Sequence, residues 1–303
     1  YFPDTPKVRT AIARMYTNIE KADAYMGELL DQLEEDGLAE NTIVMHWSDH
    51  GPMPRGKRWP YDSGIRVPMI VRWPGGIEPG TESERLINTL DLAPTVLSLA
   101  GVPVPYHMQG MAFLGQQEAP PRDYAFAARD RYDESYDMIR AARDKRFKYI
   151  RHYHPELPYL LWIPYRNRHP ILEEMWRLHM AGELEGAQRL MFEPRPVEEL
   201  YDTENDPWEI NNLAGDPAYM PELQRMRDAL DDWRAEVGDL GEIDEAEMVQ
   251  GWYPNARMDQ APDPERDDWS EPRGGRPRTA APLVIPISDA GYGRDAITGG
   301  TFP

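Results

Sequence analysis

The stretch Thr42-Ile43-Val44-Met45-His46-Trp47-Ser48-Asp49-His50-Gly51 decides the fold. Its first six residues are rich in β-forming side chains and hardly alternate between apolar and polar, which predicts a strand buried inside a sheet. The polar tetrapeptide Ser48–Gly51 follows at once. These side chains are therefore expected at the carboxyl end of the strand, where open α/β sheets bind their ligands.

The segments around this strand indicate a layered α/β arrangement. Upstream, apolar residues recur every three or four positions between Thr5, a predicted N-cap, and Gly37, a predicted C-cap, so a long amphipathic helix is expected. Downstream, residues 67–73 read as a second buried strand, and Asp91 is expected to cap a helix that ends at Gly101. The order helix, strand, loop, strand, helix is typical of α/β proteins.

The pattern of predicted secondary structure changes beyond about residue 123. Three short β-rich runs follow, at residues 124–127, 139–142 and 147–150. They predict a small antiparallel sheet, on which an amphipathic helix over residues 220–237 packs. Pro, Gly, Asp and Arg dominate from Trp252 onward, which is typical of a linker or extended tail. We therefore expect three regions: an α/β core over 1–122, an α+β subdomain over 123–243 and a Pro/Gly-rich tail over 244–303.

Composition excludes several classes of function. The 303 residues carry a formal net charge of −20, which argues against binding to nucleic acid or to anionic membranes. The chain has no cysteine, so it has no disulfide, no thiolate zinc site and no cysteine nucleophile. It also lacks any run of about 18 apolar residues, the length that a membrane-spanning helix requires.

Two basic stretches stand out from this acidic background, at residues 55–72 and 140–151. A positive island in an acidic protein suggests an anionic ligand, although a solvated basic face would give the same pattern. Both interpretations stay open at this point.

The pair Asp49 and His50 combines a carboxylate with an imidazole, which can share one divalent cation. By themselves these residues and Gly51 are equally typical of a capped turn, and that interpretation is the simpler one. The cationic loop that follows favours a ligand, because Lys57 suits an oxygen of sulfate or phosphate and Arg55 and Arg58 could bind one bidentately.

Several ordered motifs resemble the second half of the sulfatase domain of the alkaline phosphatase superfamily. They are Ser48–Gly51, Lys57, Tyr61–Pro68, Val71–Gly75, Asn88–Thr95, Glu199–Asp202, Asn205–Pro207 and Glu209–Leu213. The resemblance runs from about Tyr1 to Gly238, and Ala128–Tyr159 is most similar to bacterial heparan N-sulfatase-like sequences. It implies the second half of an alkaline-phosphatase-like sheet sandwiched by helices, followed by a small α+β subdomain with an antiparallel sheet.

The resemblance also implies roles for single residues. Asp49 and His50 match metal ligands, most often for Ca2+, and Lys57 matches the catalytic lysine that contacts the sulfate group. Arg55 and Arg58 are expected to assist in substrate binding. The implied activity is hydrolysis of a sulfate ester on a carbohydrate or a related small molecule, by a protein exported to the periplasm or the medium.

The formylglycine nucleophile of such enzymes arises from a C/S-x-P-x-R motif, which this sequence does not contain. We therefore expect the chain to be inactive alone and to require an N-terminal half as its partner. A metal-dependent phosphodiesterase or phosphonate hydrolase of the same superfamily is the alternative, and a non-catalytic fragment is a third. For His152 and His154 a substrate cleft and a polar surface both stay open, and the surface is the simpler interpretation. Stacking on sugar rings and core packing both stay open for three aromatic residues, Trp162, Tyr165 and Trp176.

Overall fold

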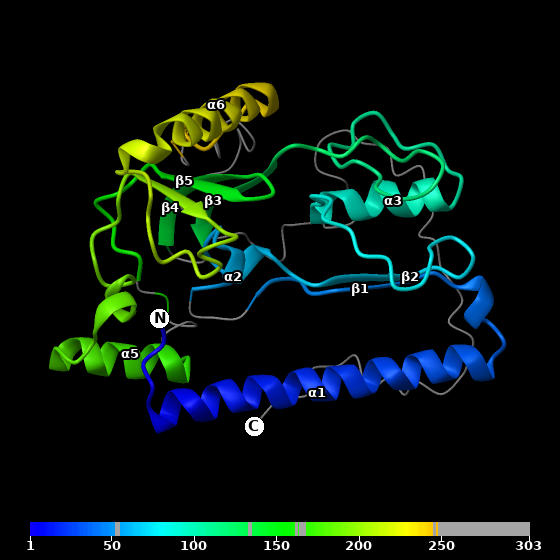
Figure 1. Ribbon diagram of the computed structural model, residues 1–303, viewed down its shortest axis with the longest axis horizontal. Helices are drawn as coiled ribbons and strands as arrows, with labels where there is room; N and C mark the ends of the chain where they lie inside the picture. The colour runs from blue at the N-terminus through cyan, green and yellow to red at the C-terminus, as the bar shows by residue number, and fades with distance from the viewer. Residues whose placement is uncertain (52–54, 133–134, 161–162, 164–167, 245–246, 248–303) are drawn as a thin grey trace, which may run out of the picture. The chain divides into compact units, whose positions relative to one another are not determined.

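The computed structural model describes residues 1–51, 55–132, 135–160, 163, 168–244 and 247 (Figure 1). Contacts gather Tyr1–Glu242 into one compact unit, to which all the elements below belong, and Ile243–Pro303 form a second. Most of the predicted tail, as well as Trp162 and Tyr165, lies outside the described residues. None of the described helices combines the length and apolar composition that a membrane span needs. The predicted domain boundary at residues 122 and 123 stays a prediction.

The first helix, α1, spans Pro6–Glu35 and confirms the predicted amphipathic helix. The Thr5 side chain caps it by accepting a hydrogen bond from the Val8 amide, and Gly37 follows it with a positive φ of 68°. The helix buries only Val8, however, and Ile19 of its apolar stripe is exposed. The reason is that α1 packs mainly on α5, Pro170–Ala181, so that much of its apolar stripe is uncovered within the described residues.

Strands β1, Val44–Trp47, and β2, Met69–Arg72, form a two-stranded antiparallel sheet. The prediction that both strands are buried is wrong for the described residues, because Trp47 is 44% exposed and Ile70 is 62% exposed. No third described strand flanks this pair, so its sides stay open. The register places Trp47 opposite Met69. The turn after β1 and the segment before β2 therefore lie next to each other at the same end of the two strands.

Helix α3, Leu92–Leu99, ends before Gly101 as predicted, but Asp91 does not cap it with its side chain. Asn88 instead caps a short 3-10 helix, η2, Thr89–Asp91, that leads into α3. The buried Asp91 carboxylate accepts hydrogen bonds from the amides of Asn88 and Met111 and from Arg122. Asp91 thus ties the loop beyond α3 to the start of the helix.

The C-terminal part of the unit confirms the predicted antiparallel sheet and extends it. Its strands lie in the order β3, Ala125–Tyr132, β4, Ser135–Arg143, β5, Phe147–His152, and β6, Glu198–Asp202. Helix α6, Met220–Val237, packs on β4 and β5. The shorter helices are η1, Ala39–Asn41, α2, Asp62–Ile65, η3, Gly186–Arg189, and η4, Pro217–Tyr219.

The two faces of this four-stranded sheet differ in chemistry. One face packs Ala142, Tyr149 and Leu200 against Leu223, Met226 and Leu230 of α6. The opposite face carries Arg143, Lys148 and Glu199 next to Ala141 and Ile150, and it meets the segment around Tyr61. Successive residues of a strand point to opposite faces, so Lys148 lies on one face of the sheet and its neighbour Tyr149 lies on the other. Both faces of the sheet are thus buried, one by a helix and the other by the segment that follows the Asp-His-Gly turn.

Truncation of Leu230 tests the packing of α6 on the sheet. Leu230 is fully buried, so Leu230→Ala should lower the free energy of unfolding by about 2 to 5 kcal/mol. The nearby Leu240 is 47% exposed, and Leu240→Ala should change stability by no more than about 0.5 kcal/mol. Urea unfolding of both variants measures the difference, and equal losses would contradict the packing described.

Candidate functional site

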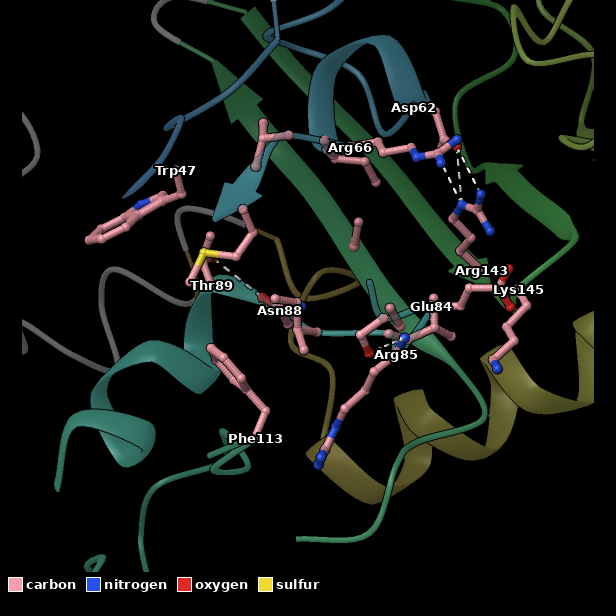
Figure 2. A pocket seen from close by; sticks show the side chains of 18 of the residues that line it. Trp47, Asp62, Arg66, Glu84, Arg85, Asn88, Thr89, Phe113, Arg143 and Lys145 are labelled. Carbon is pink, nitrogen blue, oxygen red and sulfur yellow. Dashed lines mark hydrogen bonds and ion pairs between the residues drawn. The ribbon is translucent and has the colours of Figure 1, made fainter. Parts of the chain in front are cut away.

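Three of the predicted site residues, Asp49, His50 and Lys57, line one wide cavity of about 1670 Å³. Asp49 and His50 come from the turn after β1, and Lys57 comes from the loop that leads to α2. Arg66, Asn88 and Lys145 also lie along the wall of the cavity (Figure 2). The residues chosen for a metal and for an anion are therefore on the same cavity, as the resemblance implies.

The turn itself is built by hydrogen bonds among its own atoms. The His50 amide donates to Asp49 Oδ1 at 2.9 Å, and Ser48 Oγ donates to the His50 carbonyl at 3.0 Å. The amide of His50 is the main cause that lowers the pKa of Asp49 from its usual value, which keeps this exposed carboxylate ionised. The turn thus presents a fixed negative charge toward solvent.

The imidazole of His50 is oriented in a way that suits a metal ligand. Its Nδ1 lies 2.9 Å from the Gly51 carbonyl oxygen, which can only accept a hydrogen bond, so Nδ1 carries the hydrogen. In the neutral ring Nε2 is then left with a lone pair, 3.2 Å from Asp49 Oδ2. Two electron-rich atoms that converge in this way suit a shared cation.

These two residues could supply only part of a metal site. Within the described part of the chain, no three acidic or histidine side chains come together as a metal cluster. A hard cation such as Ca2+ takes six to eight oxygen ligands, so a complete site would need further ligands from other residues. Asp49 and His50 therefore fit one side of a metal site.

Two glycines let the turn lie directly against the segment before β2. The Gly51 amide donates to the Gly64 carbonyl at 2.8 Å, and a Cβ on Gly51 would lie 1.8 Å from the Ser63 carbonyl oxygen. A Cβ on Gly64 would in turn lie 2.1 Å from the Gly56 carbonyl oxygen. Only glycine fits at these contacts, because any side chain would push the backbones apart.

The segment before β2 is clamped by charges from the C-terminal sheet. Lys148 pairs with the Asp62 carboxylate and donates to the Pro60 carbonyl at 2.9 Å, while Arg143 Nε reaches both Asp62 oxygens at 3.1 Å (Figure 2). Burial opposes ionisation of Asp62, but Lys148 and Arg143 outweigh it and lower its pKa. Glu209 Oε2 accepts a hydrogen bond from the Asp62 amide at 2.7 Å.

A second buried contact involves Glu199, which is fully inaccessible to solvent. Its carboxylate accepts hydrogen bonds from the hydroxyls of Tyr61, Tyr159 and Tyr201, and His152 Nε2 lies 3.1 Å away. Burial opposes ionisation of Glu199, but His152, Tyr159 and Tyr61 together lower its pKa. The interpretation of His152 as a surface residue is therefore wrong, because Glu199 binds it inside the protein.

Arg55 and Arg58 are not among the described residues that line the cavity. Arg55 is buried and donates to the carbonyls of Trp208 and Glu209 at 2.9 and 2.8 Å, and it lies over the ring of Tyr61. Arg58 is also buried. The expectation that these arginines assist in substrate binding stays a prediction, and Arg55 is engaged by backbone oxygens within the fold.

Sequence reasoning missed the residues that clamp the segment before β2, namely Asp62, Arg143, Lys148 and Glu209. The basic stretch at residues 140–151 suggests an anionic ligand or a solvated face, and neither interpretation includes a buried ion pair. One signal was available: Arg143 and Lys148 lie on the same face of the hairpin as the apolar Ala141 and Ile150. Charges that share a face with core residues indicate a buried ion pair.

Comparisons with known proteins agree with this arrangement. Residues 1–102 match the sulfatase family model. An ulvan-active sulfatase of Formosa agariphila is 46% identical over 251 residues, which cover 82% of this chain and 42% of that relative. The human N-sulphoglucosamine sulphohydrolase is 29% identical over 79% of this chain and 50% of its own length. The chain therefore belongs to the sulfatase family.

A solved structure supports the fold. A protein in complex with its substrate D-glucosamine-2-N,6-O-disulfate aligns with a TM-score of 0.55 and 24% identity, over 75% of this chain and 41% of that one. This likeness confirms the expected alkaline-phosphatase-like α/β fold. The chain spans about half the length of these relatives or less. The finer similarity to heparan N-sulfatases stays a prediction, since the ulvan-active relative is more similar than the human one.

Replacement of Gly51 tests the close contact beneath the turn. Gly51→Ala should weaken binding of Ca2+ by the complete protein at least tenfold, because the new Cβ would displace the turn from Ser63 and Gly64. Gly27→Ala is the control, because Gly27 lies within α1 with open space around it, and it should stabilise the protein by about 0.5 to 1 kcal/mol. Calorimetric titration with Ca2+ and thermal unfolding measure the two effects. Wild-type affinity in Gly51→Ala would refute the contact.

Asp202 makes stability depend on pH at the end of β6. The hydrogen bond from Arg146 lowers the pKa of Asp202 from 3.8 to about 2. Because the pKa is depressed in the folded state, the stabilisation is complete above about pH 4 and is lost as the pH falls through about 2. Arg146→Met should therefore destabilise the protein at neutral pH. The difference in the free energy of unfolding between this variant and wild type should become smaller as the pH falls from about 4 to about 2. Urea midpoints across this range test it, and a constant difference would contradict the assignment.

Proposed function

We propose that this chain supplies one side of the active site of a sulfuric ester hydrolase that acts on a sulfated carbohydrate. The observation that carries the proposal is the convergence of Asp49, His50 and Lys57, from two separate segments, on one cavity. One divalent cation held by Asp49 and His50, together with the positive charge of Lys57, would stabilise negative charge on a tetrahedral oxyanion. Membership of the sulfatase family supports the choice of sulfate as that oxyanion.

Each residue has a distinct part in this proposal. Asp49 and His50 hold a divalent cation, most suitably Ca2+, which when bound withdraws negative charge from the sulfate oxygens. Lys57 brings a positive charge to the leaving oxygen, where charge develops as the ester bond breaks. The formylglycine nucleophile and the other metal ligands come from residues outside this chain, so the chain alone is expected to be inactive.

The substrate class rests on the relatives. One is described as ulvan-active, another acts on N-sulphoglucosamine, and a structural neighbour was solved with a disulfated glucosamine. Those descriptions belong to those proteins, and they support a sulfated carbohydrate as substrate here. Export to the periplasm or the medium stays a prediction from the resemblance.

The complete protein, with its own nucleophile, tests the reaction. It should hydrolyse an aryl sulfate faster than an aryl phosphodiester, and chelation of Ca2+ should abolish the reaction. Lys57→Ala should lower kcat on the aryl sulfate by about a hundredfold or more. Lys21→Ala, which removes an exposed lysine from α1, is the matched control and should leave kcat unchanged.

The alternatives make different predictions in the same assay. Faster turnover of the phosphodiester would favour a phosphodiesterase or phosphonate hydrolase. No turnover of either substrate, by a protein that carries a processed nucleophile, would indicate a non-catalytic member of the family. Unchanged kcat in Lys57→Ala would remove the lysine from the proposed mechanism.

A further inference from the structure

Glu209 has an unusual backbone conformation. Among the described residues other than glycine it alone has a positive φ, of 53°. This left-handed conformation is unfavourable for a residue with a Cβ, and it persists only where the surrounding structure enforces it. Glu209 is also buried, with 1% of its surface exposed. A strained, buried acidic residue in the loop after β6 calls for a physical reason.

The contacts of Glu209 show what this conformation achieves. Its side-chain Oε2 accepts a hydrogen bond from the Asp62 amide at 2.7 Å, and its carbonyl oxygen accepts one from Arg55 Nη2 at 2.8 Å. Its Oε1 lies 3.3 Å from Lys148 Nζ. One residue therefore holds two points of the chain, at positions 55 and 62, and Lys57 lies between them.

The segment between those two points is closed upon itself. Ser63 Oγ donates to the Arg55 carbonyl at 2.8 Å, so the two ends of the loop are bonded to each other as well as to Glu209. The Gly51 amide donates to the Gly64 carbonyl at 2.8 Å. A continuous set of contacts thus runs from Glu209 through residues 55–64 to the turn that bears Asp49 and His50.

We propose that Glu209 is a positioning residue of the active site, which sets the place of Lys57 and of the metal-binding turn without contacting the substrate. The main chain and the side chain of Glu209 must point to Arg55 and Asp62 at once, and the left-handed backbone makes this possible. The inference rests on the proposed function for its catalytic readout. It also gives a physical reason for the acidic residue at the head of the Glu209–Leu213 motif.

Two variants separate positioning from stability. Glu209→Gly removes the carboxylate but relieves the backbone strain, whereas Glu209→Ala removes the carboxylate and keeps the strain. Both should lower kcat on an aryl sulfate at least tenfold and weaken Ca2+ binding in the complete protein, although Glu209→Gly should melt at a higher temperature than Glu209→Ala. Glu209→Gln keeps an acceptor for the Asp62 amide and should restore kcat to within a few-fold of wild type.

Glu193→Gly is the control, because Glu193 is an exposed acidic residue that precedes β6, and its kcat should be unchanged. A purely structural role would make kcat follow the melting temperature, so that Glu209→Gly would be more active than Glu209→Ala. That result, or wild-type kcat and Ca2+ affinity in Glu209→Gly, would overturn the proposal.

Hydrogen exchange tests the positioning without reference to catalysis. In Glu209→Gly the amides of residues 56–64 should exchange at least tenfold faster, while those of β4 and β5 keep their protection. Unchanged exchange in residues 56–64 would refute the positioning role even if the wild-type enzyme were active. If the wild-type protein hydrolyses no sulfate ester but exchange increases as expected, the proposed function fails and the role of Glu209 in holding this loop stands.

Discussion

The buried pair of Lys148 and Asp62 is the contact on which the described structure depends. Lys148 has no exposed surface and Asp62 has 6%. Removing two charges from water is costly, so such a pair is weak support for stability, and the loss of one partner would leave an uncompensated charge. The pair joins the C-terminal sheet to the segment before β2. The pair instead specifies one position for the segment, because only there do the charges of Asp62, Arg143 and Lys148 all have partners.

This contact explains how the C-terminal sheet bears on Asp49, His50 and Lys57, although none of the three residues lies in that sheet. Asp49, His50 and Lys57 all precede β2 in the chain, whereas the residues that clamp their loop come from β4, β5 and the loop after β6. Polar groups that act as a unit in a low-dielectric interior hold their neighbours rigidly. Catalysis demands such rigidity, because small misplacements of a charged group cost much of the rate.

The sequence predicted the elements with strong periodicity and the residues with distinctive chemistry. The α1 and α6 helices and the β3–β5 sheet follow from local patterns, and Asp49, His50 and Lys57 follow from motifs. The clamp could not be predicted, because the pairing of Lys148 with Asp62 joins residues far apart in the chain. The exposure of Trp47 and Ile70 was also missed, since burial of a strand depends on neighbours that its own sequence does not describe.

The alternation of charge and apolar residues on the four-stranded sheet also bears on how its hairpins find their register. A slip of one residue between β4 and β5 would turn Lys148 toward the apolar face of α6 and Tyr149 toward Asp62. The face under α6 would then contain a buried unpaired charge, and the opposite face would contain an aromatic ring where Asp62 needs a cation. The correct pairing is thus specified twice, by hydrophobicity on one side and by electrostatics on the other. For this reason a single-residue insertion in either strand should be tolerated far less than one in an ordinary sheet with a solvated face.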